Sequence, residues 1–115
     1  TNKPIRPTLR ILNFLGWDMF SGVSTPDSWC DMKRRTKAES IAATIHKFRL
    51  KMNNVLMVGD TLGDIRAAHM VFVNAAAVLW GYEKNKIGLR KEADVAFSTV
   101  QELKQFLFND IRGCL

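Results

Sequence analysis

Cysteine is scarce in this sequence, and its two cysteines, Cys30 and Cys114, lie far apart. Two such residues are too few for a disulfide framework, and their spacing is not that of a metal site. Proline is scarce as well, with three residues, and no Pro/Gly/Ser-rich stretch interrupts the chain. We therefore expect two free thiols and one domain, or part of one, over residues 1–115.

Long apolar runs are also absent. No segment approaches the roughly 18 apolar residues that are needed to cross a bilayer. The opening TNKPIRPTLR lacks the apolar stretch of a secretory signal. We expect a cytoplasmic protein with no membrane partner. Because the first residue is threonine rather than methionine, we also expect that the chain was processed or that it is part of a longer protein.

The formal net charge of +6 at pH 7 raises the alternative of a basic nucleic-acid-binding domain, since clustered lysine and arginine residues bind phosphate backbones. Only Lys33, Arg34 and Arg35, followed by Lys37, form a basic run. No tryptophan is interleaved with this run, as a stacking platform would require. A solvated loop is the favoured interpretation, so nucleic acid is not an expected partner.

Apolar residues recur at helical spacing in the first half of the chain. One set ends at Gly16, a typical C-terminal stop, and consists of Leu9, Leu12 and Leu15. A second set follows Thr36, a plausible N-cap with Glu39 three residues later, and consists of Ile41, Ile45, Phe48 and Met52. Between these two predicted helices, residues 19–23 are a short strand candidate and residues 24–35 a loop.

Three apolar runs in the second half alternate with helical segments. The runs cover residues 54–58, 75–80 and 94–97, and each has the pattern of a strand buried on both faces of a parallel sheet. The helical segment after the first run carries Ile65, Ala68 and Phe72, which we expect to face inward. The segment after the second run carries Leu89. The segment after the third run carries Val100, Leu103 and Leu107 and follows Thr99 as a possible cap. The alternation predicts an α/β fold, a Rossmann-like parallel sheet with helices on both faces.

The turn after the first apolar run, VGDTLGDIRAA, contains two carboxylates four residues apart, Asp60 and Asp64. Ligands of open parallel sheets bind beyond the carboxyl ends of the strands, where Asp60 falls, and Gly59 permits a tight turn. Two carboxylates make a hard oxygen site that suits Mg²⁺. Alternatively, Asp64 only caps the helix and Asp60 only forms the turn. The glycine spacing matches neither dinucleotide-binding nor P-loop motifs.

Taken in order, the segments TNKP, KRRTKAES, VGDTLGDIRAA, AAAVLWGY and ADVAF resemble the haloacid dehalogenase superfamily, closest to its phosphoglycolate phosphatase-like members. The resemblance implies Mg²⁺-dependent hydrolysis of a small phosphorylated metabolite. It implies that Thr1 and the backbone N–H of Asn2 bind the phosphoryl group, and that Lys37 neutralises the nucleophile and phosphoryl oxygens. It also implies that Asp60 binds Mg²⁺ and that Asp64 binds it directly or through water.

The resemblance further implies parts that this sequence does not contain. Family chemistry starts with an aspartate nucleophile in a D-x-D-G-T-type motif, which lies with the cap upstream of the motif matched by Thr1. We therefore expect residues 1–115 to be the C-terminal part of a single, incomplete haloacid dehalogenase-like core that does not turn over substrate alone. Its expected partner is the missing N-terminal half. The alternative is a noncatalytic remnant that acts as a binding or complementing module.

The missing first strand has a structural consequence. It would leave a gap beside residues 55–58. Unless another segment fills this gap, we expect the unpaired backbone there to make the isolated chain weakly stable or prone to aggregation.

Three local features complete the expectations. The family usually has Ala-Gly after the helix at 64–70, with the glycine left-handed, whereas this sequence has Val71-Phe72. A left-handed Phe72 would cost about 1–2 kcal/mol, unless the turn takes another path. The segment 80–82 ends a strand at the rim of Asp60 and either borders a pocket or packs. His69 has no Cys, Asp or Glu at ligand spacing, and we interpret it as an ordinary helical residue.

Overall fold

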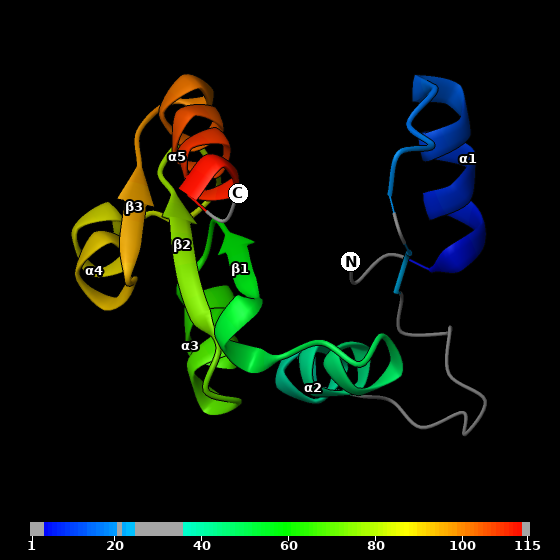
Figure 1. Cartoon of the computed structure of the whole chain (residues 1–115). Helices are drawn as coiled ribbons and strands as arrows, with labels where there is room; N and C mark the ends of the chain where they lie inside the picture. The colour runs from blue at the N-terminus through cyan, green and yellow to red at the C-terminus, as the bar shows by residue number, and fades with distance from the viewer. Residues whose placement is uncertain (1–3, 21, 25–35, 114–115) are drawn as a thin grey trace. The chain divides into compact units, whose positions relative to one another are not determined.

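The protein was analysed as a computed structural model, which describes residues 4–20, 22–24 and 36–113 (Figure 1). The chain divides into two compact units, residues 1–49 and residues 50–115. The two cysteines and the basic run at 33–35 lie outside the described residues. In the described part of the chain, no helix combines the length and the apolar character that a membrane span requires.

The first unit contains the two predicted helices. α1 spans Ile5–Leu15 and ends at the left-handed Gly16, as expected. α2 spans Lys37–Lys47 and begins with a reciprocal capping box. In that box the Thr36 hydroxyl accepts a bond from the Glu39 amide at 3.2 Å, and the Glu39 carboxylate accepts one from the Thr36 amide at 3.4 Å. The end of α1 at Gly16 and the cap of α2 are therefore confirmed, because capping depends on residues within one turn.

Two predictions for this unit are wrong. α2 ends at Lys47 rather than running to Met52, because Arg49 has a left-handed φ of 53° and Met52 belongs to the short 3₁₀ turn η1, Met52–Asn54. The described residues of the segment 19–23 form no strand. A strand requires a paired neighbour, and the described sheet does not extend to this segment.

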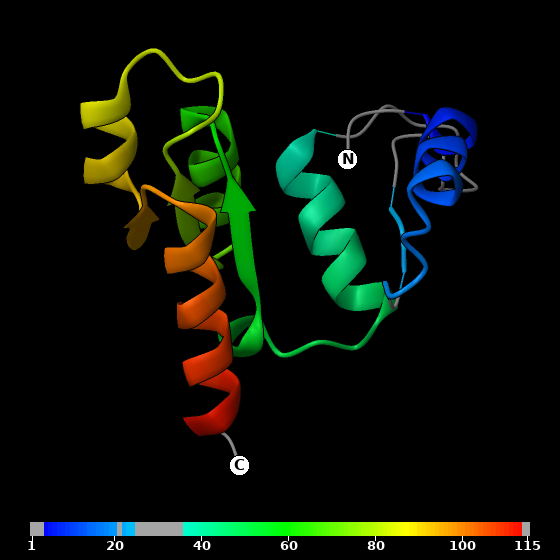
Figure 2. The ribbon, with the colours of Figure 1, turned by 90° about the horizontal axis from the view of Figure 1, so that it is seen from above.

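The second unit is a three-stranded parallel sheet with helices on both sides. Its strands pair in the order β1-β2-β3, with Met57 opposite Ala75 and Ala77 opposite Ala96. The elements are β1 (Leu56–Gly59), α3 (Leu62–Met70), β2 (Asn74–Val78), α4 (Lys86–Glu92), β3 (Val95–Phe97) and α5 (Val100–Gly113). Figure 2 shows α3 and α4 on one side of the sheet and α5 on the other. The predicted Rossmann-like architecture is thus confirmed, although the sheet is small.

The core of this unit lies between β2 and the two helices α3 and α4. The three consecutive alanines of β2, residues 75–77, are fully buried, and so are Ile65 of α3 and Leu89 of α4. Alanine side chains on a central strand let a helix approach the sheet closely, and this accounts for the extensive contact of α3 with β1 and β2. The prediction of a strand buried on both faces is confirmed for β2, which pairs with β1 on one edge and with β3 on the other.

That same prediction is wrong for β1. Val58 is 40% exposed, and the other apolar residues of β1 are only partly buried. The cause is position, because β1 is the edge of the described sheet and α5, the helix on the second side, packs on β3. Within the described sheet, β1 therefore has one open edge and a partly exposed face.

The turn after α3 takes the left-handed path. Phe72 has a φ of 62° and an 85% exposed side chain, so the expectation that it faces inward is wrong. Its amide donates to the carbonyl of His69, and the next amide, of Val73, donates to that of Ala68. Val73, which is 1% exposed, takes the inward place instead. The helix end is thus held at the backbone conformation for which glycine is the favoured residue.

Candidate functional site

The candidate site lies at the carboxyl ends of β1 and β2, where two chain segments meet. Asp60 follows the last residue of β1, and the segment after β2 passes beside it. Together they line an open hollow of about 530 Å³, formed by Val58, Gly59, Asp60, Val78, Trp80, Gly81 and Tyr82. This is the edge at which open parallel sheets bind their ligands.

Asp64 ties the turn to the first turn of α3. Its Oδ2 accepts hydrogen bonds from the backbone amides of Asp60 at 3.1 Å and of Thr61 at 3.2 Å. The Thr61 hydroxyl in turn accepts a bond from the Asp64 amide at 3.2 Å, so Thr61 is the N-cap of α3. The side chain of Asp64 is buried, and a Cβ at Gly59 would collide with it. The turn therefore needs glycine at 59, and one oxygen of Asp64 is occupied by the backbone.

Asp60 is fixed from the other side, by the segment after β2. Its Oδ2 accepts a hydrogen bond from the Tyr82 amide at 3.0 Å. A Cβ at Gly81 would collide with the Cβ and Oδ2 of Asp60, so the backbone of residue 81 lies directly against this side chain. One oxygen of Asp60 is therefore oriented by a main-chain donor, while the residue lines the hollow.

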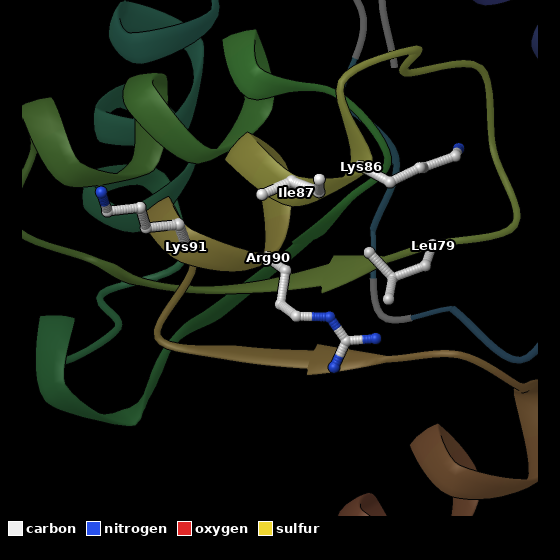
Figure 3. Close-up of a pocket in the computed structure, with 5 residues that line it drawn as sticks. All are labelled: Leu79, Lys86, Ile87, Arg90 and Lys91. Atoms are coloured by element: carbon white, nitrogen blue, oxygen red, sulfur yellow. The ribbon is translucent and has the colours of Figure 1, made fainter.

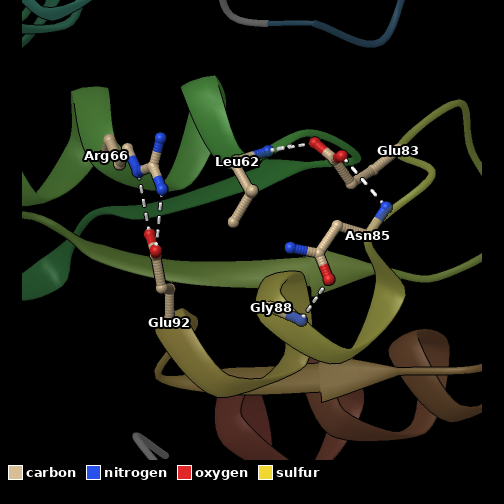
Figure 4. A network of polar contacts seen from close by, with 6 residues as sticks. All are labelled: Leu62, Arg66, Glu83, Asn85, Gly88 and Glu92. Carbon is tan, nitrogen blue, oxygen red and sulfur yellow. Dashed lines mark hydrogen bonds and ion pairs between the residues drawn. The ribbon is translucent and has the colours of Figure 1, made fainter.

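Glu83 links the segment 79–85 to the start of α3 through hydrogen bonds. Its carboxylate accepts one bond from the Leu62 amide at 3.0 Å and another from the Asn85 amide at 3.2 Å (Figure 4). These bonds, that of Leu62 first, lower the pKa of Glu83. Sequence reasoning missed this residue, because the bond to Leu62 spans 21 positions and no local pattern marks it. The Lys86 ammonium holds the same segment by donating to the Gly81 carbonyl at 2.7 Å.

The aromatic residues at the rim are exposed rather than packed. Trp80 is 47% and Tyr82 93% exposed, and both border the hollow. Of the two interpretations of the segment 80–82, the geometry matches the pocket border and does not match core packing.

The structure brings together two of the five predicted site residues. Asp60 and Asp64 share one turn, at the hollow. Lys37 is the first residue of α2 in the other unit and is half-buried. Thr1 and Asn2 lie outside the described residues. The roles assigned to these five residues stay predictions.

The donor set fits a magnesium ion. Within the described ranges, no group of three or more His, Cys, Asp or Glu side chains gathers at one point. Mg²⁺ commonly takes only one or two carboxylates and completes its shell with water and substrate phosphate. Asp60, which lines the hollow, and Asp64, which accepts the Asp60 amide, provide two carboxylates in one turn. Asp60 and Asp64 would hold such an ion.

No protein family model matches the sequence. The phosphoglycolate phosphatase of Psychrobacter arcticus is 31% identical over 111 residues, which make up 93% of this chain and 46% of that protein. A solved structure from Clostridium difficile, described as a candidate phosphatase, is 28% identical with a TM-score of 0.78, and the match covers 93% of this chain and 50% of the other.

Two further solved structures share the fold at lower identity. A hydrolase of the haloacid dehalogenase-like family from Streptococcus pneumoniae has a TM-score of 0.76 at 18% identity, over 93% of this chain and 50% of its own. A predicted phosphatase from Clostridium acetobutylicum has a TM-score of 0.80 at 22% identity, over 95% and 50%. The chain thus spans about half the length of the relatives it matches.

Proposed function

We propose that this chain, which resembles the C-terminal half of haloacid dehalogenase-like phosphatases in sequence and fold, forms the metal-binding half of a phosphate monoester hydrolase. The proposal covers the full enzyme, whose substrate would be a small phosphorylated metabolite. The observation that carries it is the pairing of Asp60 with Asp64 at the carboxyl end of β1, beside an open hollow.

Each residue of the turn has a stated role in this proposal. Asp60 would bind Mg²⁺, and the Tyr82 amide orients its carboxylate. Asp64 holds the backbone of residues 60 and 61 in place and reaches the ion directly or through water. The bound ion would supply charge neutralisation for phosphate oxygens. Trp80 and Tyr82 border the space that the substrate enters.

The family resemblance alone gives three residues of the first unit a proposed role. Lys37 neutralises the nucleophile and phosphoryl oxygens, and Thr1 with the Asn2 amide binds the phosphoryl group. The aspartate nucleophile comes from an upstream segment, because the sequence holds no D-x-D-G-T-type motif. The resemblance in sequence to a phosphoglycolate phosphatase supports a small, anionic phosphate ester as the substrate.

Metal binding by the chain tests the first part of the proposal. We expect calorimetric titration with MgCl₂ to show one site, and Asp60→Asn to weaken it by about tenfold or more, since a ligand charge is lost. The matched control is Asp18→Asn, which removes an exposed carboxylate of the first unit. Equal Mg²⁺ affinity in the Asp60 variant and the control would contradict the assignment.

Complementation tests the second part. We expect the pure chain to release no phosphate from an aryl phosphate, and a mixture with the N-terminal half of the Psychrobacter arcticus relative to release it in a Mg²⁺-dependent manner. Robust hydrolysis by the chain alone, abolished by Asp60→Asn, would overturn the expectation that it lacks the nucleophile. A stable but inactive complex would instead favour the second candidate function, a noncatalytic complementing module, for which the open edge of β1 is the specific observation.

A further inference from the structure

A second hollow lies beside α4 and shares no lining residue with the hollow at Asp60. It has a volume of about 330 Å³ and is lined by Leu79, Lys86, Ile87, Arg90 and Lys91, which we call the α4 patch. Figure 3 shows the three basic side chains pointing away from one another around Ile87. Nothing in the proposed phosphatase chemistry uses these five residues for catalysis.

The centre of the α4 patch is apolar and exposed. Ile87 is 84% exposed, whereas Leu89, two positions along the same helix, is fully buried. α4 therefore anchors itself to the core through Leu89 and presents Ile87 outward, next to the half-buried Leu79. Single exposed apolar side chains are common, but this one borders a hollow with an aliphatic floor.

Arg90 and Lys91 give the rim of the α4 patch a positive charge, and the nearby Glu92 does not neutralise it. Glu92 is held by Arg66 through two bonds, at 3.1 and 2.9 Å, and its pKa is lowered chiefly by that contact (Figure 4). Among the described residues, Arg90 donates to the neutral Ser98 hydroxyl, at 3.5 Å. In the described part of the chain, Arg90 and Lys91 form no ion pair with a carboxylate.

Lys86 is more engaged than the other two cations. Its ammonium donates to the Gly81 carbonyl, and its charge contributes to the lowered pKa of Glu83 without an ion pair between them. The surplus charge of the patch therefore rests on Arg90 and Lys91. Both project from a helix whose start is fixed by the Asn85 side chain, which accepts a bond from the Gly88 amide at 3.0 Å (Figure 4).

We propose that the α4 patch docks an acidic peptide segment of a partner protein, with one apolar anchor residue against Ile87 and Leu79 and flanking carboxylates on Arg90 and Lys91. Charge complementarity selects an acidic partner, and the aliphatic floor selects an apolar anchor. Nucleic acid fits less well, because single strands need aromatic stacking platforms and no lining residue of the patch is aromatic.

Titration of the full chain with short peptides tests this proposal by fluorescence anisotropy. The probe is a labelled glutamate-rich peptide with a central Leu-Phe pair. The comparison ligands are the same peptide with Ser-Ser at the centre and a labelled single-stranded oligonucleotide. We expect the anchored peptide to bind at least about tenfold more tightly than either, since the anchor contributes burial that charge alone does not.

Three variants locate the site. Ile87→Asp and Arg90→Glu are each expected to weaken the anchored peptide about tenfold or more. Lys104→Glu, an exposed α5 position with the same change in charge as Arg90→Glu, is expected to stay within about twofold. Circular dichroism checks that all variants keep the fold.

Four results would overturn the proposal: no binding of the anchored peptide, equal binding of the Ser-Ser peptide, tighter binding of the oligonucleotide, or an unchanged affinity in Ile87→Asp. Each leaves the phosphatase proposal intact, because that proposal is tested through Asp60.

Discussion

Phe72 is a bulky residue in a left-handed backbone conformation. Its φ of 62° is one that an L-amino acid adopts at a cost of about 1–2 kcal/mol, and its side chain gains little in return because it is 85% exposed. The conformation persists because the turn bonds to Ala68 and His69 close the end of α3. The local strain is therefore offset by the helix end that it completes.

We predict that Phe72→Gly stabilises the chain by about 1 kcal/mol, because glycine adopts the left-handed conformation without a Cβ clash. Urea unfolding followed by circular dichroism measures the change. Met70→Gly is the matched control, since Met70 is also an exposed apolar residue, 72% exposed, but is the last helical residue of α3. Glycine there should destabilise the chain by about 1 kcal/mol. A loss of stability in both variants would show that contacts of the Phe72 side chain stabilise the fold by more than its backbone conformation costs.

Gly81 is the second residue whose identity is constrained, because the side chain of Asp60 leaves no room for a Cβ at this position. We predict that Gly81→Ala weakens Mg²⁺ binding about tenfold, because the new Cβ would displace the Asp60 carboxylate from its place beside the Tyr82 amide. The matched control is Gly63→Ala, where the nearest atom is the Thr61 hydroxyl at 3.7 Å. Calorimetric titration of both variants gives the comparison. Equal Mg²⁺ affinities in the two variants would show that Gly81 does not position Asp60 for metal binding.

At the scale of elements, α3 is connected to the strands by bonds between residues that are distant in sequence. His69, near the end of α3, lies 2.9 Å from Asp94, and the same carboxylate oxygen accepts the Ala75 amide at 2.8 Å. The interpretation of His69 as an ordinary helical residue missed this contact, because its partner is 25 positions away. The contact joins α3 to the starts of β2 and β3.

This contact makes stability depend on pH. The amide of Ala75 first, and His69 second, lower the pKa of Asp94 in the folded state. A carboxyl with a lowered folded pKa stabilises the fold above its unfolded pKa of about 3.9 and loses that contribution as the pH falls through the folded value. We predict that Asp94→Asn flattens the acid side of the stability curve, measured as urea midpoints from about pH 6 to about pH 3. In Asp18→Asn, the control, the curve should keep the wild-type slope, and an identical slope in both variants would contradict the prediction.

The elements themselves were largely predictable, because helix periodicity and caps are local. The capping residues Thr36 and Thr61 and the central strand β2 follow from residues within a few positions of each other. Pairing is not local, so the sequence predicted a strand at 19–23 that the described residues of this segment do not form. The candidate site divides in the same way, since Asp60 and Asp64 share one turn whereas the contact of Gly81 with Asp60 depends on how two loops meet.

For the whole molecule, the main feature is that the matched relatives are about twice as long as this chain. β1 is the edge of the described sheet, and it carries the turn with the two aspartates. An edge strand presents unpaired N–H and C=O groups, to which another strand can add. The site and the open edge are thus neighbours, and the proposed catalysis and the proposed association with an upstream half depend on the same strand.

The open edge predicts self-association of the isolated chain, with Val58 as the residue to test. Val58→Lys places a charge on the poorly covered face of β1, and we expect association to require concentrations about tenfold higher, or ~1.4 kcal/mol. Sedimentation velocity over a dilution series measures the shift. Val100→Lys is the matched control, because Val100 is more exposed, at 59%, but belongs to α5. If both variants shift association equally, added charge and not the edge of β1 governs it. A monomeric wild-type chain at all concentrations would mean that this edge is protected.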